Sequence, residues 1–142
     1  MHKFLSFHWA ASWGDAGVLV LRLALGAVFA MHGYQKLTQM GVEGVTGFLG
    51  GLGFPMPEVF AVLLIAAELG GGILLILGAL TRLSAFVTGF VALMAFLTVH
   101  ASHGFFVGGG GYEFIVLIFA ACLTLLVSGA GRYSLDRLWF KL

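Results

Sequence analysis

Four long apolar stretches constrain the fold of this chain more than any other feature of its sequence. They cover about residues 17–37, 58–80, 83–101 and 112–128. A helix needs about 20 residues to cross roughly 30 Å of hydrocarbon, and each stretch comes close to that length. Of the 142 residues, 61% are hydrophobic and 9% are charged, whereas a soluble domain carries about 25% charged residues. The sequence therefore predicts one all-α membrane domain, residues 1–142, built as an antiparallel bundle of four transmembrane helices.

Short breaks between the apolar stretches support these boundaries. Thr81-Arg82 lies in a very short connection, so the second and third spans should form an antiparallel hairpin. Gly108–Gly111 is a run of glycines before the fourth span. The apolar segment 44–54 is too short to span, so we expect an interfacial or re-entrant piece there. Its last part, 50–54, is rich in glycine and should not be a regular helix.

The basic residues predict the orientation, because short cytoplasmic loops carry an excess of Lys and Arg. One side of the bundle would hold Lys3, Arg82, Arg132, Arg137 and Lys141. The other side would hold only Lys36. Both termini should therefore be cytoplasmic, with the first and third loops facing outward. The formal net charge is only +1, so the lipid membrane is the expected partner and nucleic acid is not.

Ionisable side chains inside the predicted spans are the strongest functional signal, because such groups are costly in a bilayer. Placed by helical rise, five of them come from four different helices and lie between the midplane and the outer surface. They are His32, Lys36, Glu68, His100 and Glu113.

Three spans also carry stripes of small and polar residues at helical spacing. Small residues let helices approach closely in lipid, so these stripes should face the bundle interior. The stripes are Arg22, Gly26, Phe29, Gly33 and Lys36 in the first span; Glu68, Gly71, Gly72 and Leu75 in the second; and Glu113, Ala120, Thr124 and Ser128 in the fourth.

Each polar residue also has a structural interpretation. Glu68 could pair with Arg22 or with a histidine to hold the bundle together, and Lys36 could extend to the membrane surface. For Glu113 the structural role is favoured, whereas for the deeper His32 and Glu68 a functional role is favoured. Cys122 is the single cysteine, so the chain offers no dithiol for electron transfer.

The order of the motifs resembles that of a known family. The sequence carries Arg22-Leu-Ala-Leu-Gly26, His32-Gly33-x-x-Lys36-Leu37, Glu68-Leu-Gly-Gly, Gly78-x-x-Thr81-Arg82, His100, Glu113 and Gly129-x-Gly131-Arg132-x-Ser134-Leu135-Asp136. Over about residues 18–138 this pattern resembles the DoxX family of small bacterial membrane proteins. Single elements of the pattern are weak signals, but the ordered set is specific.

The resemblance implies a four-helix, multi-pass protein of the bacterial cytoplasmic (inner) membrane. The family name comes from a subunit associated with thiosulfate:quinone oxidoreductase, and other relatives are linked to quinone or catechol stress and to oxidative-stress complexes. The family's recurring positions correspond here to Arg22, His32, Lys36, Glu68, Arg82, His100, Glu113 and Asp136.

The leading functional hypothesis is a quinone-interacting redox protein, or the membrane subunit of an oxidoreductase. The expected catalytic residues are His32, Glu68 and His100, and the expected head-group site is His32, Lys36, His100 and Glu113. His32 would donate to one quinone carbonyl, His100 or Lys36 to the other, and Glu68 would relay protons. No motif for a covalent or nucleotide cofactor is present, so electrons would come from a soluble or membrane redox partner or from a bound small molecule.

Other hypotheses stay open at this stage. His32 and His100 could ligate a haem, or together with the glutamates a metal, but no spacing signature supports either, so neither is expected. The chain could instead be a non-catalytic scaffold that holds soluble redox enzymes by its basic tail, or a permease with Glu68 as its proton site. The small-residue faces also suit a homodimer. The sequence leaves open whether the protein is an enzyme.

Overall fold

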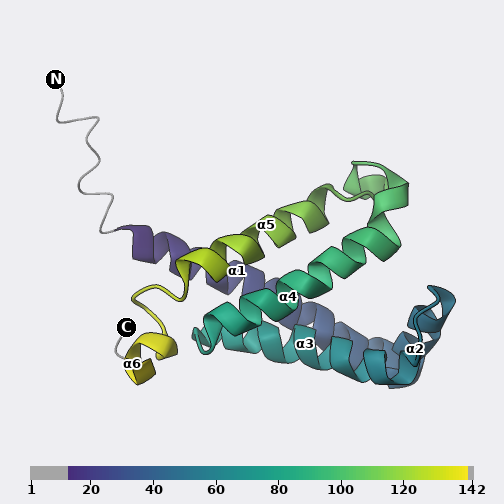
Figure 1. Ribbon diagram of the computed structural model, residues 1–142, viewed down its shortest axis with the longest axis horizontal. Coiled ribbons are helices and arrows are strands. Elements are labelled where there is room, and N and C mark those ends of the chain that lie inside the picture. Colours follow the sequence, from purple (N-terminus) through teal and green to yellow (C-terminus); the bar gives the residue numbers. More distant parts are fainter. Residues whose placement is uncertain (1–12, 141–142) are drawn as a thin grey trace.

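A computed structural model describes residues 13–140, and these residues form helices with no β-strand among them (Figure 1). The helices are α1 (Gly14–Gln35), α2 (Gly41–Gly51), α3 (Pro57–Leu77), α4 (Thr81–Ala95), α5 (Glu113–Ser128) and α6 (Leu135–Phe140). π-helical segments, Lys36–Met40 and Phe96–His100, extend α1 and α4. The all-helical prediction is confirmed. Lys3 and Lys141 lie outside the described residues.

Helix length separates one predicted span from the other three. The helical stretches 14–51, 57–77 and 81–103 are long and apolar enough to cross a membrane. The fourth, α5, is equally apolar but has only 16 residues, a rise of about 24 Å. All four predicted spans are therefore helices, and α5 is short for a membrane crossing.

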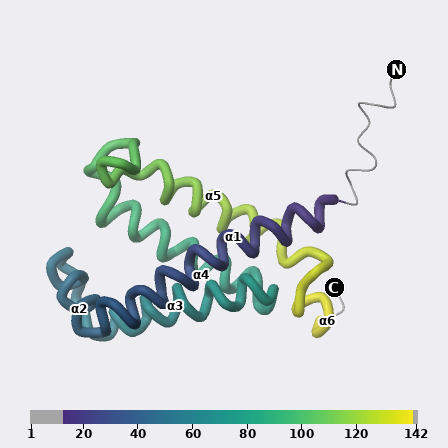
Figure 2. The backbone as a smooth tube through the Cα atoms, turned by 180° about the vertical axis from the view of Figure 1, so that it is seen from behind, coloured from purple at the N-terminus to yellow at the C-terminus, as the bar shows by residue number. Residues whose placement is uncertain are grey.

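The helices pack as two pairs, α1 with α3 and α4 with α5. At one end, here called the tail end, α1 begins, the α3–α4 turn lies at 78–80, and α5 leads into α6 (Figure 1). At the other end, the loop end, lie α2 and the α4–α5 connection 96–112 (Figure 1). Figures 1 and 2 show the two pairs close together toward the tail end and apart at the loop end.

Glycines bring α1 and α3 into backbone contact. A Cβ added to Gly26 would lie 2.7 Å from the carbonyl oxygen of Gly72, and one added to Gly33 would collide with the backbone of Leu69. Such close approach is typical of helices that pack through small residues in lipid. The predicted inward stripes of the first two helices are confirmed, since their residues Arg22, Gly26, Phe29, Gly33, Glu68, Gly71, Gly72 and Leu75 are buried.

The stripe predicted for the fourth span is wrong. Ala120, Thr124 and Ser128 are exposed, and α5 instead buries Ile118, Cys122 and Leu125 against the core. The hydroxyls of the two polar residues donate to carbonyl oxygens in their own helix, four residues back. Because this bond satisfies the hydroxyl locally, Ser and Thr can face lipid at little cost.

The segment between the first two spans is helical and lies against α3. In α2, Val45 and Leu49 are buried with Ala61 and Ile65 of α3. The helix continues through Gly51 before the chain turns, so the predicted absence of helix in 50–54 is wrong for the first two residues of that segment. The apolar face of α2 pairs with α3, which is why this stretch can be helical without spanning.

The tail folds back onto the helices at the tail end. Arg22, only 1% exposed, donates from its two terminal nitrogens to the carbonyl oxygens of Ala130 at 2.6 Å and Tyr133 at 2.5 Å. Asp136 accepts from the backbone amides of Leu80 at 2.6 Å and Thr81 at 2.8 Å, at the start of α4. The tail motif and the α3–α4 turn are thus two halves of one hydrogen-bonded unit.

Candidate functional site

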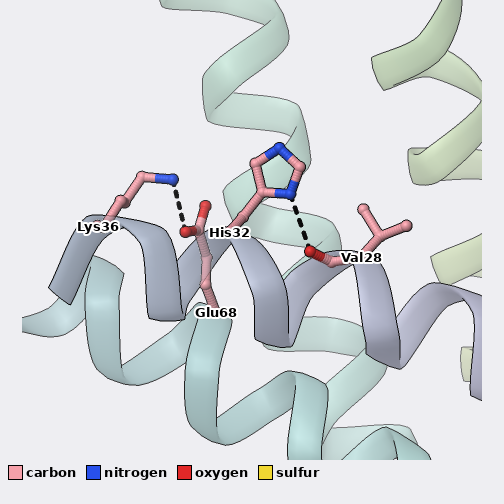
Figure 3. Close-up of polar contacts among 4 residues, drawn as sticks. All are labelled: Val28, His32, Lys36 and Glu68. Carbon is pink, nitrogen blue, oxygen red and sulfur yellow. Dashed lines mark hydrogen bonds and ion pairs between the residues drawn. The ribbon is translucent and has the colours of Figure 1, made fainter. Parts of the chain in front are cut away.

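The centre of the candidate site is an ion pair between α1 and α3. The Lys36 ammonium lies 2.6 Å from Oε2 of Glu68 (Figure 3). Glu68 is only 6% exposed, and the Lys36 side chain 18%. Lys36 therefore turns toward Glu68, and the hydrogen bond neutralises a carboxylate that would otherwise be costly among apolar helices.

The glycine contact between the helices explains why these two charges meet. Gly33 packs on the backbone of Leu69, the residue that follows Glu68. Lys36 lies one turn beyond Gly33 on the same face of the helix, so its side chain passes directly over the carboxylate. Any side chain at position 33 would increase the distance between the helices at this point.

His32 lies one turn before Lys36, and all three polar side chains project from the same side of the helix pair in Figure 3. Its Nδ1 lies 2.8 Å from the carbonyl oxygen of Val28. A carbonyl can only accept, so the proton of this bond sits on Nδ1. In the neutral imidazole Nε2 is then an acceptor, and the side chain is exposed. His32 thus presents a proton acceptor toward any molecule that binds there.

The combination suits an aromatic diol and its oxidised dione. The Lys36 ammonium has three N–H donors, one of which is committed to Glu68. It can donate to a carbonyl oxygen, while the imidazole accepts from a hydroxyl. Carboxyl and imidazole groups are the side-chain types that most often carry protons in catalysis.

His100 and Glu113 belong to a different part of the molecule: His100 lies in the α4–α5 connection and Glu113 is the first residue of α5. His100 Nδ1 donates to the carbonyl oxygen of Gly110 at 2.7 Å, and Glu113 accepts from the amide of Val107 at 2.7 Å. Within residues 13–140, no hydrogen bond or ion pair links these two side chains to His32, Lys36 or Glu68. Both side chains shape this connection.

The described residues also bear on the metal hypothesis. In the part of the chain that the structure describes, no group of three or more His, Cys, Asp or Glu side chains is arranged to hold a metal ion. His32 and His100 each have one ring nitrogen bonded to a local carbonyl, in separate hydrogen-bonded groups.

Sequence reasoning missed the pairing itself. It considered Arg22 or a histidine as the partner of Glu68 and placed Lys36 at the membrane surface, whereas the structure pairs Lys36 with Glu68 and Arg22 with the tail. The available signal was that Lys36 and Glu68 are opposite charges on two small-residue stripes. Two such stripes pack together most closely, which brings charges on them within reach of each other.

Comparisons with known proteins agree with this architecture. The DoxX family profile matches residues 17–101. The chain is 35% identical to "Inner membrane protein YqjF" of Escherichia coli K12 over 128 residues, 89% of this chain and 95% of that protein. It is 32% identical to "Putative oxidoreductase CatD" of Bacillus subtilis 168 over 127 residues, 89% and 90% of the two chains.

A further relative is "Inner membrane protein YphA" of Escherichia coli K12, 33% identical over 125 residues, 84% of this chain and 88% of that protein. No solved structure matches the chain. The relatives align along nearly their whole length, and the described residues carry apolar helices of membrane-spanning length. The chain therefore belongs to the DoxX family of multi-pass bacterial inner-membrane proteins.

Proposed function

We propose that this protein binds a quinone or a related aromatic diol at the Lys36–Glu68 pair and takes part in its oxidation or reduction. The observation that carries the proposal is the low-exposure ion pair with an imidazole one turn away, on one side of α1 and α3 (Figure 3). Structural contacts between membrane helices are made more cheaply with Gly, Ser and Thr, so three ionisable groups at one place favour a ligand.

The chemistry assigns each side chain a role. Lys36 donates to a carbonyl oxygen of the quinone, and His32 accepts the hydroxyl proton of the quinol through Nε2. Reduction of a quinone to a quinol takes up two electrons and two protons. Glu68 and His32 exchange the protons. The two electrons come from an external reductant, a redox partner protein or a bound small molecule, because the chain has no dithiol of its own. The name of the Bacillus subtilis relative, "Putative oxidoreductase CatD", supports this class of reaction.

We also propose that α1, α3, α4 and α5 cross the membrane in alternating directions, with both termini cytoplasmic. Arg82, Arg132 and Arg137 all lie at the tail end, as expected for the cytoplasmic side. Phe106 to Cys and Arg132 to Cys variants would test this, since Cys122 is buried. In intact cells a membrane-impermeant thiol reagent should label only Phe106→Cys; labelling of Arg132→Cys alone would reverse the orientation.

The scaffold hypothesis receives less support, because the described tail is committed to the bundle through Arg22 and Asp136. A scaffold test therefore has to spare Asp136. Leu138 and Trp139 are 73% and 59% exposed and are suitable positions for change. If a Leu138→Ser/Trp139→Ser variant lost function while His32→Ala kept it, the scaffold would replace the quinone proposal.

The proposal is tested by quinone binding to purified protein in mild detergent. Equilibrium dialysis with a short-chain ubiquinone would compare wild type with His32→Ala, Lys36→Met and Glu68→Gln. His32→Ala and Lys36→Met should each bind about tenfold or more weakly, because a hydrogen bond between the ligand and a charged or strongly accepting group is lost. Glu68→Gln should also bind more weakly, because the carboxylate that positions the Lys36 ammonium is lost.

His103→Ala is the matched control. His103 is an exposed histidine whose Nδ1 bonds to the Val99 carbonyl, and its removal should leave binding unchanged. His100→Ala separates two versions of the site: unchanged binding confines the head group to α1 and α3, and weakened binding extends the site to the loop. Quinone binding that none of the three site variants weakens would contradict the proposal.

A further inference from the structure

A second place in the molecule has the properties of a binding site and is independent of the proposed redox function. At the tail end, an open pocket of about 430 Å³ lies between the start of α4 and the folded-back tail. Its lining includes Thr81, Arg82, Asp136 and Arg137, and none of His32, Lys36 or Glu68. The α3–α4 turn and α6 that border it lie close together in Figure 1.

The two arginines of this pocket have hydrogen-bond donors that the described residues do not use. Arg82 and Arg137 are both exposed, and among residues 13–140 the ion pair of Lys36 with Glu68 is the only one. Arg82 donates from one terminal nitrogen to the Leu126 carbonyl at 3.1 Å, which leaves the rest of its guanidinium fork open.

The acidic residues that line the pocket are already engaged by backbone donors. Asp136 accepts from the amides of Leu80 and Thr81 with its two oxygens. Asp15 accepts from the amide of Arg132 at 2.9 Å. Neither carboxylate forms a salt bridge with Arg82 or Arg137, so both guanidinium groups keep donors that a ligand could use.

A buried hydroxyl gives a second, independent sign of a missing partner. Thr81 is 0% exposed and lines the pocket, yet its Oγ1 has no hydrogen-bond partner. Leaving a buried hydroxyl unpaired is unfavourable. The first turn of a helix also has free amides, and Asp136 takes only those up to Thr81. An oxygen-rich anion would supply acceptors for these free amides.

Large apolar side chains also border the pocket, alongside Ser128 and Ser134, and they indicate the kind of anion. Leu80, Leu83 and Phe140 border the pocket, and next to them Leu138 and Trp139 are exposed. Trp at this level is typical of a membrane surface. A ligand with an anionic head and an apolar body therefore matches the lining better than a free anion does.

We propose that this pocket binds the phosphate of an anionic membrane lipid, held by the guanidinium groups of Arg82 and Arg137. Planar guanidinium groups bind phosphate oxygens through two parallel hydrogen bonds. Basic pockets at the ends of membrane helices recognise lipid head groups by the same chemistry.

The test uses the full chain, purified and stripped of lipid, and titrated with phosphatidylglycerol or with phosphatidylcholine in mixed micelles. Native mass spectrometry reads the bound lipid. The wild type should bind phosphatidylglycerol about tenfold more tightly than phosphatidylcholine, and Arg82→Gln and Arg137→Gln should each lose most of that preference.

Arg132→Gln is the matched control, because Arg132 is an exposed arginine of the same tail that does not line the pocket; it should keep the preference. Equal losses in all three variants would indicate general attraction and overturn the pocket. If the wild type bound phosphatidylglycerol and phosphatidylcholine equally well, that result alone would overturn the proposal. Inorganic phosphate that competes as well as the lipid would overturn the assignment to a lipid.

Discussion

A single charge on Lys36 or on Glu68 would be unfavourable in the interior of an apolar bundle. Pairing the two charges reduces that free-energy cost. The carboxylate is nearly sealed from solvent, and its one hydrogen-bond partner in the described residues is the ammonium. Removing one member of such a pair leaves an uncompensated charge, whereas removing both leaves none. The pair should therefore behave as a unit.

A double-mutant cycle would measure this coupling. Lys36→Met and Glu68→Gln should each destabilise the protein by about 3 kcal/mol if the remaining charge stays ionised. The double variant should recover a large part of that loss. Thermal unfolding in mild detergent provides the four midpoints. Additive losses would show that the two side chains do not interact.

The contribution of Arg22 to stability depends on the geometry of its side chain more than on its charge, because the guanidinium group donates to two carbonyl oxygens at once. An ammonium is a compact group on a flexible stem and does not reproduce two donors in a fixed plane. The buried Nε of Arg22 has no partner in the described part of the chain, so the site already holds the side chain at some cost.

Arg22→Lys should consequently loosen the tail while keeping its positive charge. Loss of about 1.4 kcal/mol would speed amide hydrogen exchange about tenfold in the tail segment 130–137. Arg132→Lys, at an exposed position of the tail, should leave exchange unchanged. Unaltered exchange in Arg22→Lys would mean that charge alone holds the tail.

The contact between helices α1 and α3 is a backbone contact, and it determines where the Lys36–Glu68 pair lies. A Cβ added to Gly26 or to Gly72 would lie only 2.7 Å from the carbonyl oxygen of the other, and one added to Gly33 would collide with the backbone of Leu69. Packing of this kind depends on the absence of side chains, so a single methyl group is enough to disturb it.

Two glycines of α3 offer a matched comparison. A Cβ on Gly72 would collide with the backbone of Ala30, whereas one on Gly70 would meet nothing within 4 Å. Gly72→Ala should cost about 1–3 kcal/mol, and Gly70→Ala should be neutral or stabilising by up to about 1 kcal/mol. Thermal midpoints in one detergent would show the difference. Equal changes in the midpoints of the two variants would mean that the backbones of α1 and α3 are not in contact at Gly72.

The two ends of the bundle differ in how the elements there are connected by hydrogen bonds. The tail end is tied together by Arg22, by Asp136 and by Ser134, whose hydroxyl accepts from the amide of Arg137 at the start of α6. At the loop end the helix pairs diverge (Figure 2). Hydrogen bonds between separate elements are therefore concentrated at the tail end, and the candidate site lies on the pair α1–α3 beyond it.

A chain that ends at Ser128 tests this division. It would lose the acceptors of Arg22 and the carboxylate at the start of α4, leaving one buried cation and two helix amides without partners. Its thermal midpoint should fall further than that of Arg22→Lys, because both losses act at once. A midpoint equal to that of the full chain would show that the tail does not contribute to bundle stability.

Several features follow from the sequence alone. Helix type and approximate span positions come from runs of apolar residues, because a backbone in lipid must satisfy its hydrogen bonds internally. The inward faces of α1 and α3 follow from glycines at helical spacing, and the family follows from the order of the motifs. Each of these features depends on local sequence or on periodicity.

Tertiary structure decided the partners. Lys36 could have reached the membrane surface and Glu68 could have met Arg22; the crossing of α1 over α3 at Gly33 selected the observed pair. Thr124 and Ser128 likewise face outward because other residues of α5 pack into the core. The physical reason is that membrane insertion of a segment depends on the hydropathy of that segment alone. The partner of a buried charge depends instead on where two helices cross.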